Sequence, residues 1–181
     1  MNVSGVSSIL LALGHRGLVH SAAVVAKGTE GFSLEDCLIT RVDGQGVLLE
    51  GYHRNASLKG NDMEWIGSHA MVSWGKTSGC LNGNCSRRLP SGDGPDGRNG
   101  DQPIGTTVQG NFVREVGVFE RQGTAWNQAL SAQTTLQGNV FLNCDRAMLN
   151  INDGFGGGNS IIGNLIANTG RGSNKDEGSI K

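Results

Sequence analysis

The stretch TLQGNVF, residues 135–141, decides the fold because the chain repeats it. Three further segments share its order of apolar residue, Gly, Asn and apolar residue: SLKGNDM at 57–63, TVQGNFV at 107–113 and IIGNLI at 161–166. A degenerate copy, SLEDCLI, occupies 33–39. Measured from Cys37 through Asn61, Asn111 and Asn139 to Asn164, the copies lie 24, 50, 28 and 25 residues apart. The repeat is therefore about 25 residues long, and the unit between the second and third copies carries an insertion.

Each unit also contains a second apolar run a few residues after its Gly-Asn or equivalent pair. These runs are DGQGVLL at 43–49, GSHAMVSW at 67–74, REVGVFE at 114–120 and CDRAMLNI at 144–151. They show no apolar stripe of helical period, and 30 glycines among 181 residues provide for many turns. Short strands and turns at this period predict an all-β chain, a single-stranded parallel β-helix of about five turns.

The recurring asparagine has a structural reason to follow glycine. In a sharp turn Asn tolerates the left-handed backbone region, and its amide can hydrogen-bond to the equivalent Asn one turn away. The sequence therefore predicts an internal ladder formed by Asn61, Asn111, Asn139 and Asn164.

The charge balance argues against polyanionic partners. The chain has 15 basic and 16 acidic residues and a net charge of −1, which does not favour nucleic acid or an anionic membrane surface. The segment AMVSWGKT at 70–77 fits a loosened phosphate-loop template, but its bulky centre and the following SGCLNGNC do not suit a loop that opens a helix. The glycine cluster NDGFGGGN at 152–159 is likewise interpreted as a turn between strands rather than a nucleotide cradle.

Several short features favour a secretory or extracellular location. The apolar run VSSILLALG at 6–14 has the length of a signal-peptide core, although no basic residues precede it, and no run is long enough for a membrane span. Three N-x-S sequons are present. Cys80 and Cys85 bracket LNGN in a polar loop, and this spacing predicts a small disulfide loop. We expect the folded chain to be a monomer.

A set of longer motifs resembles a known family. The motifs are GYHRNAS at 51–57, SHAMVSWG at 68–75, CLNGNCSRRLP at 80–90, DGRNGDQPIGT at 96–106, REVGVF at 114–119 and NINDGFGGGN at 150–159. Together they resemble largely uncharacterised right-handed parallel β-helix proteins with a pectin-lyase-like fold, found mostly in eukaryotic microbes and algae. The likeness runs from about residue 15 to 171 and implies a right-handed solenoid that acts on or binds a polysaccharide.

The resemblance also sets the expected domain boundaries. Residues 1–14 form an N-terminal apolar segment, 15–170 form the β-helix with a loop insertion at 76–105, and 171–181 form a polar tail that is expected to be disordered. Members of the family usually have several turns upstream and continue beyond 171 into an Asp-His-Gly-Pro-rich segment with a Trp-Asp pair. Here the tail reads GSNKDEGSIK, so the chain is expected to be a fragment or a truncated product.

The candidate catalytic residues stand where the second run of each unit ends. The resemblance implies a polysaccharide groove along one strand face, with the insertion at 76–105 as a wall. A hydrolase needs an acidic and a basic carboxyl group, and Glu120 and Asp153 occupy adjacent units. A lyase of this fold pairs an Arg or Lys base with groups that neutralise the uronate, and Arg54 and His53 are the further catalytic candidates.

The candidate substrate-binding residues are Asn150, Asn152, Arg121 and Trp74, because amides and guanidinium groups hydrogen-bond sugars and an indole can stack on them. No cofactor is expected except Ca²⁺, for which the insertion offers acidic residues such as Asp93, Asp96 and Asp101. Three hypotheses remain open: a lyase, hydrolase or epimerase of an acidic polysaccharide; a non-catalytic cell-surface or matrix module; and an inactive truncated copy.

Overall fold

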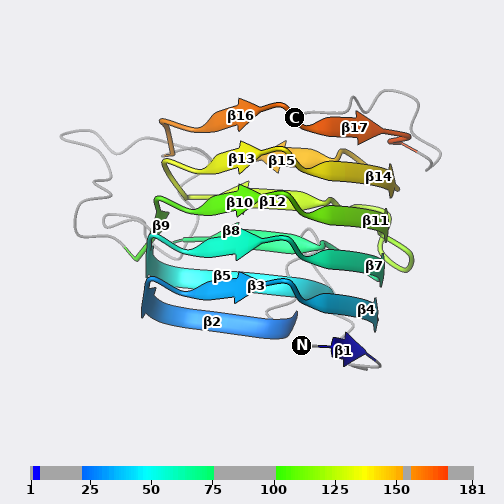
Figure 1. Cartoon of the computed structure of the whole chain (residues 1–181), viewed down its shortest axis with the longest axis horizontal. Helices are drawn as coiled ribbons and strands as arrows, with labels where there is room; N and C mark the ends of the chain where they lie inside the picture. Colours follow the sequence, from blue (N-terminus) through cyan, green and yellow to red (C-terminus); the bar gives the residue numbers. More distant parts are fainter. Residues whose placement is uncertain (1, 5–21, 76–100, 153–155, 171–181) are drawn as a thin grey trace, which may run out of the picture.

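The computed structural model describes residues 2–4, 22–75, 101–152 and 156–170, and within these ranges the chain forms strands and turns but no helix. The strands build three sheets (Figure 1). Sheet A contains β1 (Asn2–Ser4), β4 (Leu38–Val42), β7 (Asp62–Ile66), β11 (Phe112–Val116), β14 (Val140–Cys144) and β17 (Leu165–Ala167). Sheet B contains β2 (Ala22–Glu30), β5 (Gln45–Arg54), β8 (Met71–Trp74), β12 (Trp126–Ala129) and β15 (Leu149–Ile151), with β9 (Pro103–Ile104) paired to β5. Sheet C contains β3 (Ser33–Glu35), β6 (Ser57–Lys59), β10 (Thr107–Gln109), β13 (Thr135–Gln137) and β16 (Ser160–Ile162).

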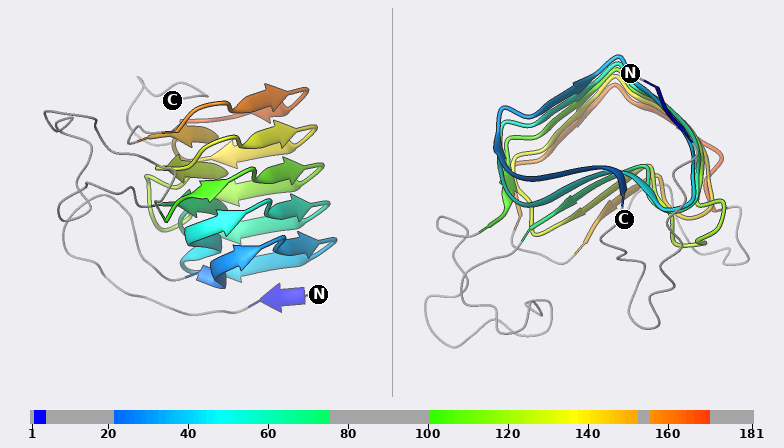
Figure 2. Two further views of the ribbon diagram at one scale, coloured as in Figure 1. Left: turned by 90° about the vertical axis from the view of Figure 1, so that its left-hand side faces the viewer. Right: turned by 90° about the horizontal axis from the view of Figure 1, so that it is seen from below.

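The chain visits the sheets in a fixed order, C then A then B, as in the successive strands β6, β7 and β8 or β13, β14 and β15. Each strand between the two ends of its sheet pairs in parallel with its equivalent in the turn below and in the turn above. Figure 2 shows the resulting stack from the side and along its axis. The predicted fold, an all-β parallel β-solenoid of about five turns, is confirmed.

One predicted strand is wrong. The sequence predicts that the run REVGVFE at 114–120 forms the second strand of its unit. In the structure its first residues end β11, and residues 117–120 bend away from the strand, starting at Gly117 with a φ of 82°. The strand that fills this position in sheet B is β12. Its centre, Asn127 and Gln128, is polar but buried and hydrogen-bonded, so apolar patterning could not reveal it.

The corner between sheets C and A explains the Gly-Asn repeat, with one correction. The left-handed residue is the glycine rather than the asparagine: Gly60, Gly110, Gly138 and Gly163 have φ values of 61°, 63°, 61° and 61°. In the degenerate copy Asp36 takes this conformation, with a φ of 49°. Glycine suits the position because it has no Cβ to oppose a positive φ. The side-chain amide of the asparagine that follows the glycine points into the interior.

Those amides form a continuous ladder through the interior. Asn61 donates from its backbone N–H and from Nδ2 to Oδ1 of Asn111, both at 2.9 Å, and donates a second Nδ2 hydrogen to the Leu34 carbonyl at 2.9 Å. Asn111 repeats these contacts to Asn139. Asn139 repeats them to Asn164, with distances of 2.9 and 2.8 Å. Each amide inside the ladder therefore has its donors and its acceptor satisfied, as a buried polar group requires.

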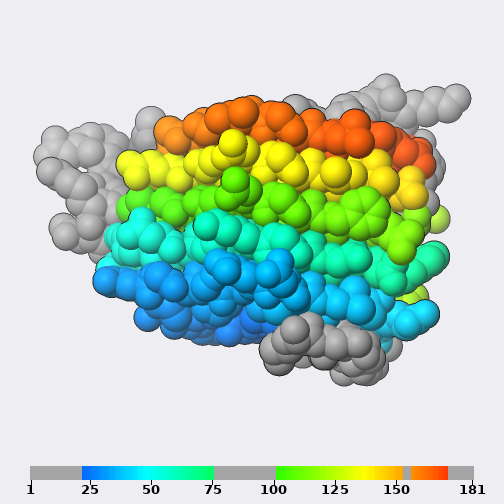
Figure 3. All heavy atoms as spheres, viewed as in Figure 1, coloured from blue at the N-terminus to red at the C-terminus, as the bar shows by residue number. Residues whose placement is uncertain are grey.

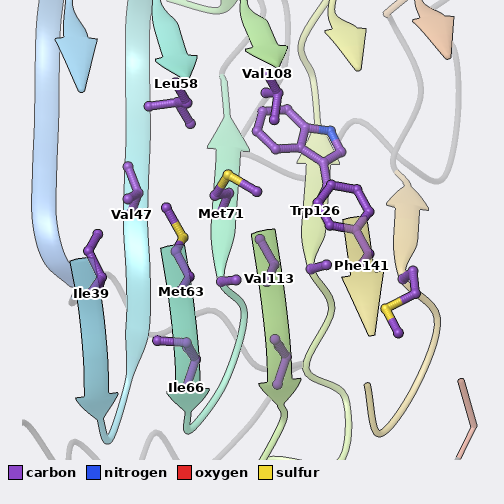
Figure 4. Packing of buried hydrophobic residues seen from close by; sticks show 14 of the residues in the cluster. Ile39, Val47, Leu58, Met63, Ile66, Met71, Val108, Val113, Trp126 and Phe141 are labelled. Atoms are coloured by element: carbon purple, nitrogen blue, oxygen red, sulfur yellow. The ribbon is translucent and has the colours of Figure 1, made fainter. Parts of the chain in front are cut away.

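Apolar side chains from the three sheets fill the rest of the interior (Figure 4). In-register columns contribute from each sheet, among them Ile39, Met63, Val113 and Phe141 from sheet A, Leu58, Val108 and Leu136 from sheet C, and Val47, Met71, Trp126 and Leu149 from sheet B. These side chains are at most 1% exposed. Because burial of one large apolar side chain stabilises a fold by about 1.5–3 kcal/mol, each added turn stabilises the one beneath it.

We expect Asn111→Ala to destabilise the chain by about 3 kcal/mol, because it removes four buried hydrogen bonds and leaves the Asn61 N–H without an acceptor. Urea unfolding followed by circular dichroism measures the change. The matched control is Gln109→Ala, two residues earlier on the exposed side of sheet C, which should change stability by less than about 0.5 kcal/mol. Equal losses in the two variants would contradict a stabilising role for the ladder.

Candidate functional site

The outer side of sheet B brings several predicted residues into one column. Lys27 pairs with Glu50, Glu50 with Trp74, and Trp74 with Ala129, on four successive strands. Asn152 directly follows β15 and hydrogen-bonds through its N–H to the Gln128 carbonyl at 2.8 Å. Since alternate residues of a strand face opposite sides, and Val47 and Leu49 belong to the interior clusters, Glu50 and its column face outward.

The exposure of this column varies along the stack. The Lys27 ammonium and the Glu50 carboxylate form an ion pair at 2.6 Å, in which the lysine side chain is 62% and the glutamate side chain 16% exposed. Trp74 is partly exposed beside this pair. Ala129 is buried, and Asn152 is again partly exposed. The partly exposed Trp74 and the Lys27–Glu50 pair therefore lie on adjacent strands of the same outward face.

A second outward column on sheet B is largely closed to solvent. Leu48, Val72, Asn127 and Asn150 lie in register and are buried. The Asn150 amide donates to Oδ1 of Asn127 at 3.0 Å. Asn150, a predicted substrate-binding residue, is thus engaged within the protein.

Beyond Glu50 the long strand β5 passes a left-handed Gly51, with a φ of 77°, and continues alongside β2. Here the Tyr52 hydroxyl donates to the Glu30 carboxylate, and the Arg54 guanidinium carbon lies 4.2 Å from the centre of the Tyr52 ring. The hydrogen bond to Glu30 is the main reason that the pKa of Tyr52 is raised. Arg54 Nη1 also donates to the carbonyls of His53 at 2.8 Å and Gln102 at 2.7 Å, so its guanidinium is held in place.

His53 lies in the same strand but points inward. It is fully buried, and its Nε2 is 2.9 Å from the Ala26 carbonyl while its Nδ1 is 2.7 Å from the Thr29 hydroxyl. Because a carbonyl only accepts, Nε2 carries the proton and Nδ1 accepts from Thr29. Burial lowers the pKa of His53. A substrate in solvent cannot contact this imidazole, a predicted catalytic residue.

Glu120 and Arg121 stand at the other end of sheet B, in the loop before β12. The Glu120 carboxylate accepts from the Ser68 hydroxyl at 2.8 Å, and its N–H donates to the Gly67 carbonyl at 2.8 Å. Arg121 is exposed. In Figure 1 this loop lies at the right margin, whereas β9, which pairs with the His53–Arg54 end of β5, lies at the left. The structure therefore does not bring Glu120 together with Arg54 and His53.

The remaining predicted residues lie outside the described part of the chain. They are Asp153, the Cys80 and Cys85 pair, and Asp93 and Asp96 of the proposed Ca²⁺ ligands. Among the described residues no group of three or more His, Cys, Asp and Glu side chains is placed to hold a metal ion.

Sequence reasoning missed Glu30 and Tyr52 as neighbours of Arg54, and Lys27 as the partner of Glu50. Strand β2 lacks the Gly-Asn motif, so nothing in the repeat revealed that Lys27 would face Glu50 or that Glu30 would face Arg54. The only available signal was the segment GYHR, in which Tyr52 and Arg54 are two residues apart and so lie on the same side of a strand.

The chain was compared with protein-family models, with curated proteins and with solved structures, and none of them matches it. The described residues also contain no helix with the length and apolar character required to cross a membrane. The candidate site therefore rests on the geometry of this chain alone.

A buried histidine at the corner between sheets A and B makes stability depend on pH. His69 Nδ1 accepts from the Thr124 N–H at 3.0 Å and lies 2.9 Å from the Thr124 hydroxyl. Burial lowers the pKa of His69 to about 4, and the Arg146 guanidinium acts in the same direction. Between that value and the ordinary pKa of about 6.5, the unfolded chain binds the proton more tightly than the folded chain does.

We therefore expect the free energy of unfolding to fall by about 3 kcal/mol from His69 as the pH drops from about 6.5 to about 4. His53, whose pKa is also lowered, adds to the loss in the same sense. Urea unfolding at half-unit pH steps measures the slope. His69→Asn keeps an acceptor near the Thr124 N–H but does not titrate, so it should flatten the slope; an unchanged slope would show that His69 is not its source.

Proposed function

We propose that this protein binds a polysaccharide, including its acidic forms, on the outer margin of sheet B. The surface, which we call the aromatic margin, consists of Lys27, Glu30, Glu50, Tyr52, Arg54 and Trp74. We also assign the solenoid to the right-handed, pectin-lyase-like kind and the protein to the extracellular space, because the motifs described above resemble that family.

The observation that carries the proposal is the pairing of two aromatic rings with fixed charges at one edge of the sheet. Tyr52 and Trp74 both adjoin Glu50, one along its own strand and the other on the next strand. The apolar face of a sugar ring packs on such rings, whereas its hydroxyls need donors and acceptors beside them. Glu50 and Glu30 supply acceptors, and Lys27 and Arg54 supply donors.

Arg54 accounts for the preference for an acidic polymer. Its guanidinium is positioned by two backbone carbonyls and by the Tyr52 ring before any ligand arrives. A guanidinium can donate two parallel hydrogen bonds to a carboxylate, and the ordering of this side chain costs little because the protein already holds it. Lys27, with 62% of its side chain exposed, adds a second positive charge opposite Glu50, which precedes Tyr52 by two residues in β5.

Binding is favoured over catalysis by the positions of the catalytic candidates. A hydrolase requires two carboxyl groups across one scissile bond. Within the described residues, Glu120 lies at the opposite end of sheet B from Arg54, and its carboxylate contacts Ser68. His53 has partners at both ring nitrogens. In this proposal the two residues therefore support the fold rather than catalyse a reaction.

The test compares two tryptophans on different sheets. Trp74→Ala should weaken binding of oligogalacturonate or oligoalginate at least tenfold in calorimetric titration, because the loss of an aromatic contact typically costs about 2 kcal/mol. Trp65→Ala is the matched control, since Trp65 is 47% exposed on sheet A and should leave affinity within about twofold. Absence of binding in the unaltered chain, or equal losses in the two variants, would overturn the proposal.

A second measurement addresses the enzymatic alternatives. The chain is incubated with pectate and alginate, with and without Ca²⁺, and followed by absorbance of unsaturated products, by reducing ends and by NMR of the polymer. We expect no turnover. Turnover that Arg54→Lys abolishes would instead make the aromatic margin a lyase, hydrolase or epimerase site.

A further inference from the structure

The loop insertion interrupts sheet B at the aromatic margin. Strand β8 ends at Trp74, and β9 takes up the pairing again at Pro103 beside the same long strand, β5. β5 pairs with β8 as far as Glu50 and with β9 from His53 onward. Figure 3 shows the green layer, which starts at residue 101, packed directly on the cyan layer below it. The chain therefore leaves sheet B and returns to it beside the residues of the aromatic margin.

The segment that returns to the sheet, residues 101–104, packs against a glycine. Gln102 is 4% exposed, and its backbone approaches Gly75 so closely that a Cβ on this glycine would lie 2.7 Å from both Cα and Cβ of Gln102. Non-bonded carbon atoms do not approach this closely, so a larger residue at position 75 has to displace Gln102. Glycine at position 75 thus allows the two backbones to meet.

The returning segment supplies one of the acceptors that hold Arg54. The Gln102 carbonyl accepts from Arg54 Nη1 at 2.7 Å, and the His53 carbonyl accepts from the same nitrogen at 2.8 Å. Pro103 follows Gln102 directly, and a residue before proline is restricted to extended backbone because the proline ring clashes with other conformations. Pro103 therefore limits the directions in which the Gln102 carbonyl can point.

These contacts leave one edge of the Arg54 guanidinium free. The group has five N–H donors, and the two carbonyls use both donors of Nη1. Among the described residues, Nε and Nη2 donate to no acceptor. The Nε–H and one Nη2–H are parallel and match the two oxygens of one carboxylate. The Tyr52 ring, whose centre lies 4.2 Å from the guanidinium carbon, and the two carbonyls fix the direction of this edge.

We propose that Gly75, Gln102 and Pro103 are positioning residues of the polysaccharide site, and that the Nε–Nη2 edge of Arg54 receives the carboxylate of one uronate residue. The inference rests on the proposed function, because it specifies which group of the acidic polymer the aromatic margin recognises. Trp74 directly precedes Gly75, so the contact that positions Arg54 also adjoins the residue that carries the indole. The indole and the guanidinium are thereby held together for the face and the carboxylate of the sugar.

Calorimetric titration of the full chain with oligogalacturonate and with its methyl ester tests the recognition. The unaltered chain should bind the acid about tenfold more tightly, because the ester cannot form charge-assisted hydrogen bonds. Gly75→Ala should reduce this preference to about twofold, since it displaces Gln102 and releases Arg54. Gly157→Ala is the matched control, because a Cβ there meets nothing within 4 Å, and it should keep the preference. An unchanged preference in Gly75→Ala would overturn the proposal.

A second variant separates positioning from a general loss of structure. Pro103→Val keeps an apolar side chain and the Gln102 carbonyl but removes the restriction on its direction, so it should lower the preference for the acid about threefold. Binding of the ester should stay within about twofold of that of the unaltered chain. If Pro103→Val weakens both ligands equally, or leaves the preference unchanged, the segment has no positioning role and the proposal is overturned.

Nuclear magnetic resonance of the Arg54 guanidinium measures the positioning without a ligand, with Arg54→Lys assigning the signal. In the unaltered chain and in Gly157→Ala the two Nη1 hydrogen bonds should slow hydrogen exchange with water, whereas Gly75→Ala and Pro103→Val should exchange faster. Fast exchange in the unaltered chain would overturn the positioning roles even if oligogalacturonate binds. Slow exchange in a chain that binds neither oligosaccharide would overturn the proposed function and the uronate assignment, while the positioning of Arg54 would stand.

Discussion

The structure depends on one constraint, which is that every turn of chain must place its buried asparagine directly above the preceding one. Each ladder amide receives two N–H groups from the turn below and donates to that turn's backbone and to the next amide. A shift of one residue in the strand register would bury these groups without partners. It would also turn the inward side chains of the adjacent strand toward solvent. The ladder thus fixes the register of all three sheets, and the apolar columns align as a consequence.

The Gly-Asn repeat was enough to predict the fold, because each copy marks a corner whose geometry demands those two residues. The strands next to the corner, in sheets C and A, were therefore found easily. Strand β12 was not, since its buried residues Asn127 and Gln128 are polar, and some of their hydrogen bonds go to Asn150 and Asn159 of the next turn. The left-handed conformation was assigned to the asparagine rather than the glycine, because both residue types tolerate it and only the backbone distinguishes them.

The candidate site could be predicted only in part, because the repeat does not tell which side of its strand each side chain occupies. The repeat indicated that Trp74, Arg54 and Asn150 lie at the end of the second strand of their units, but it did not indicate which way each side chain faces. In β5 the plain alternation continues through Gly51, so His53 follows Val47 and Leu49 inward, whereas Tyr52 and Arg54 follow Glu50 outward. The contacts of Lys27 and Glu30 depend on β2, whose sequence carries no copy of the motif. In a solenoid of this type the repeated residues lie in the interior, and the outward positions differ from turn to turn. The repeat therefore does not predict the chemistry of the surface.

The ladder has a further consequence in its electrostatics. Three of its four side-chain amides, those of Asn61, Asn111 and Asn139, donate to the amide oxygen of the next turn, so their dipoles add along the solenoid axis in the way that peptide dipoles add along a helix. The interior of this protein is therefore electrically polarised although its net charge is only −1. The positive end of this dipole lies at Asn164. A group that carries lone pairs is therefore favoured at that end.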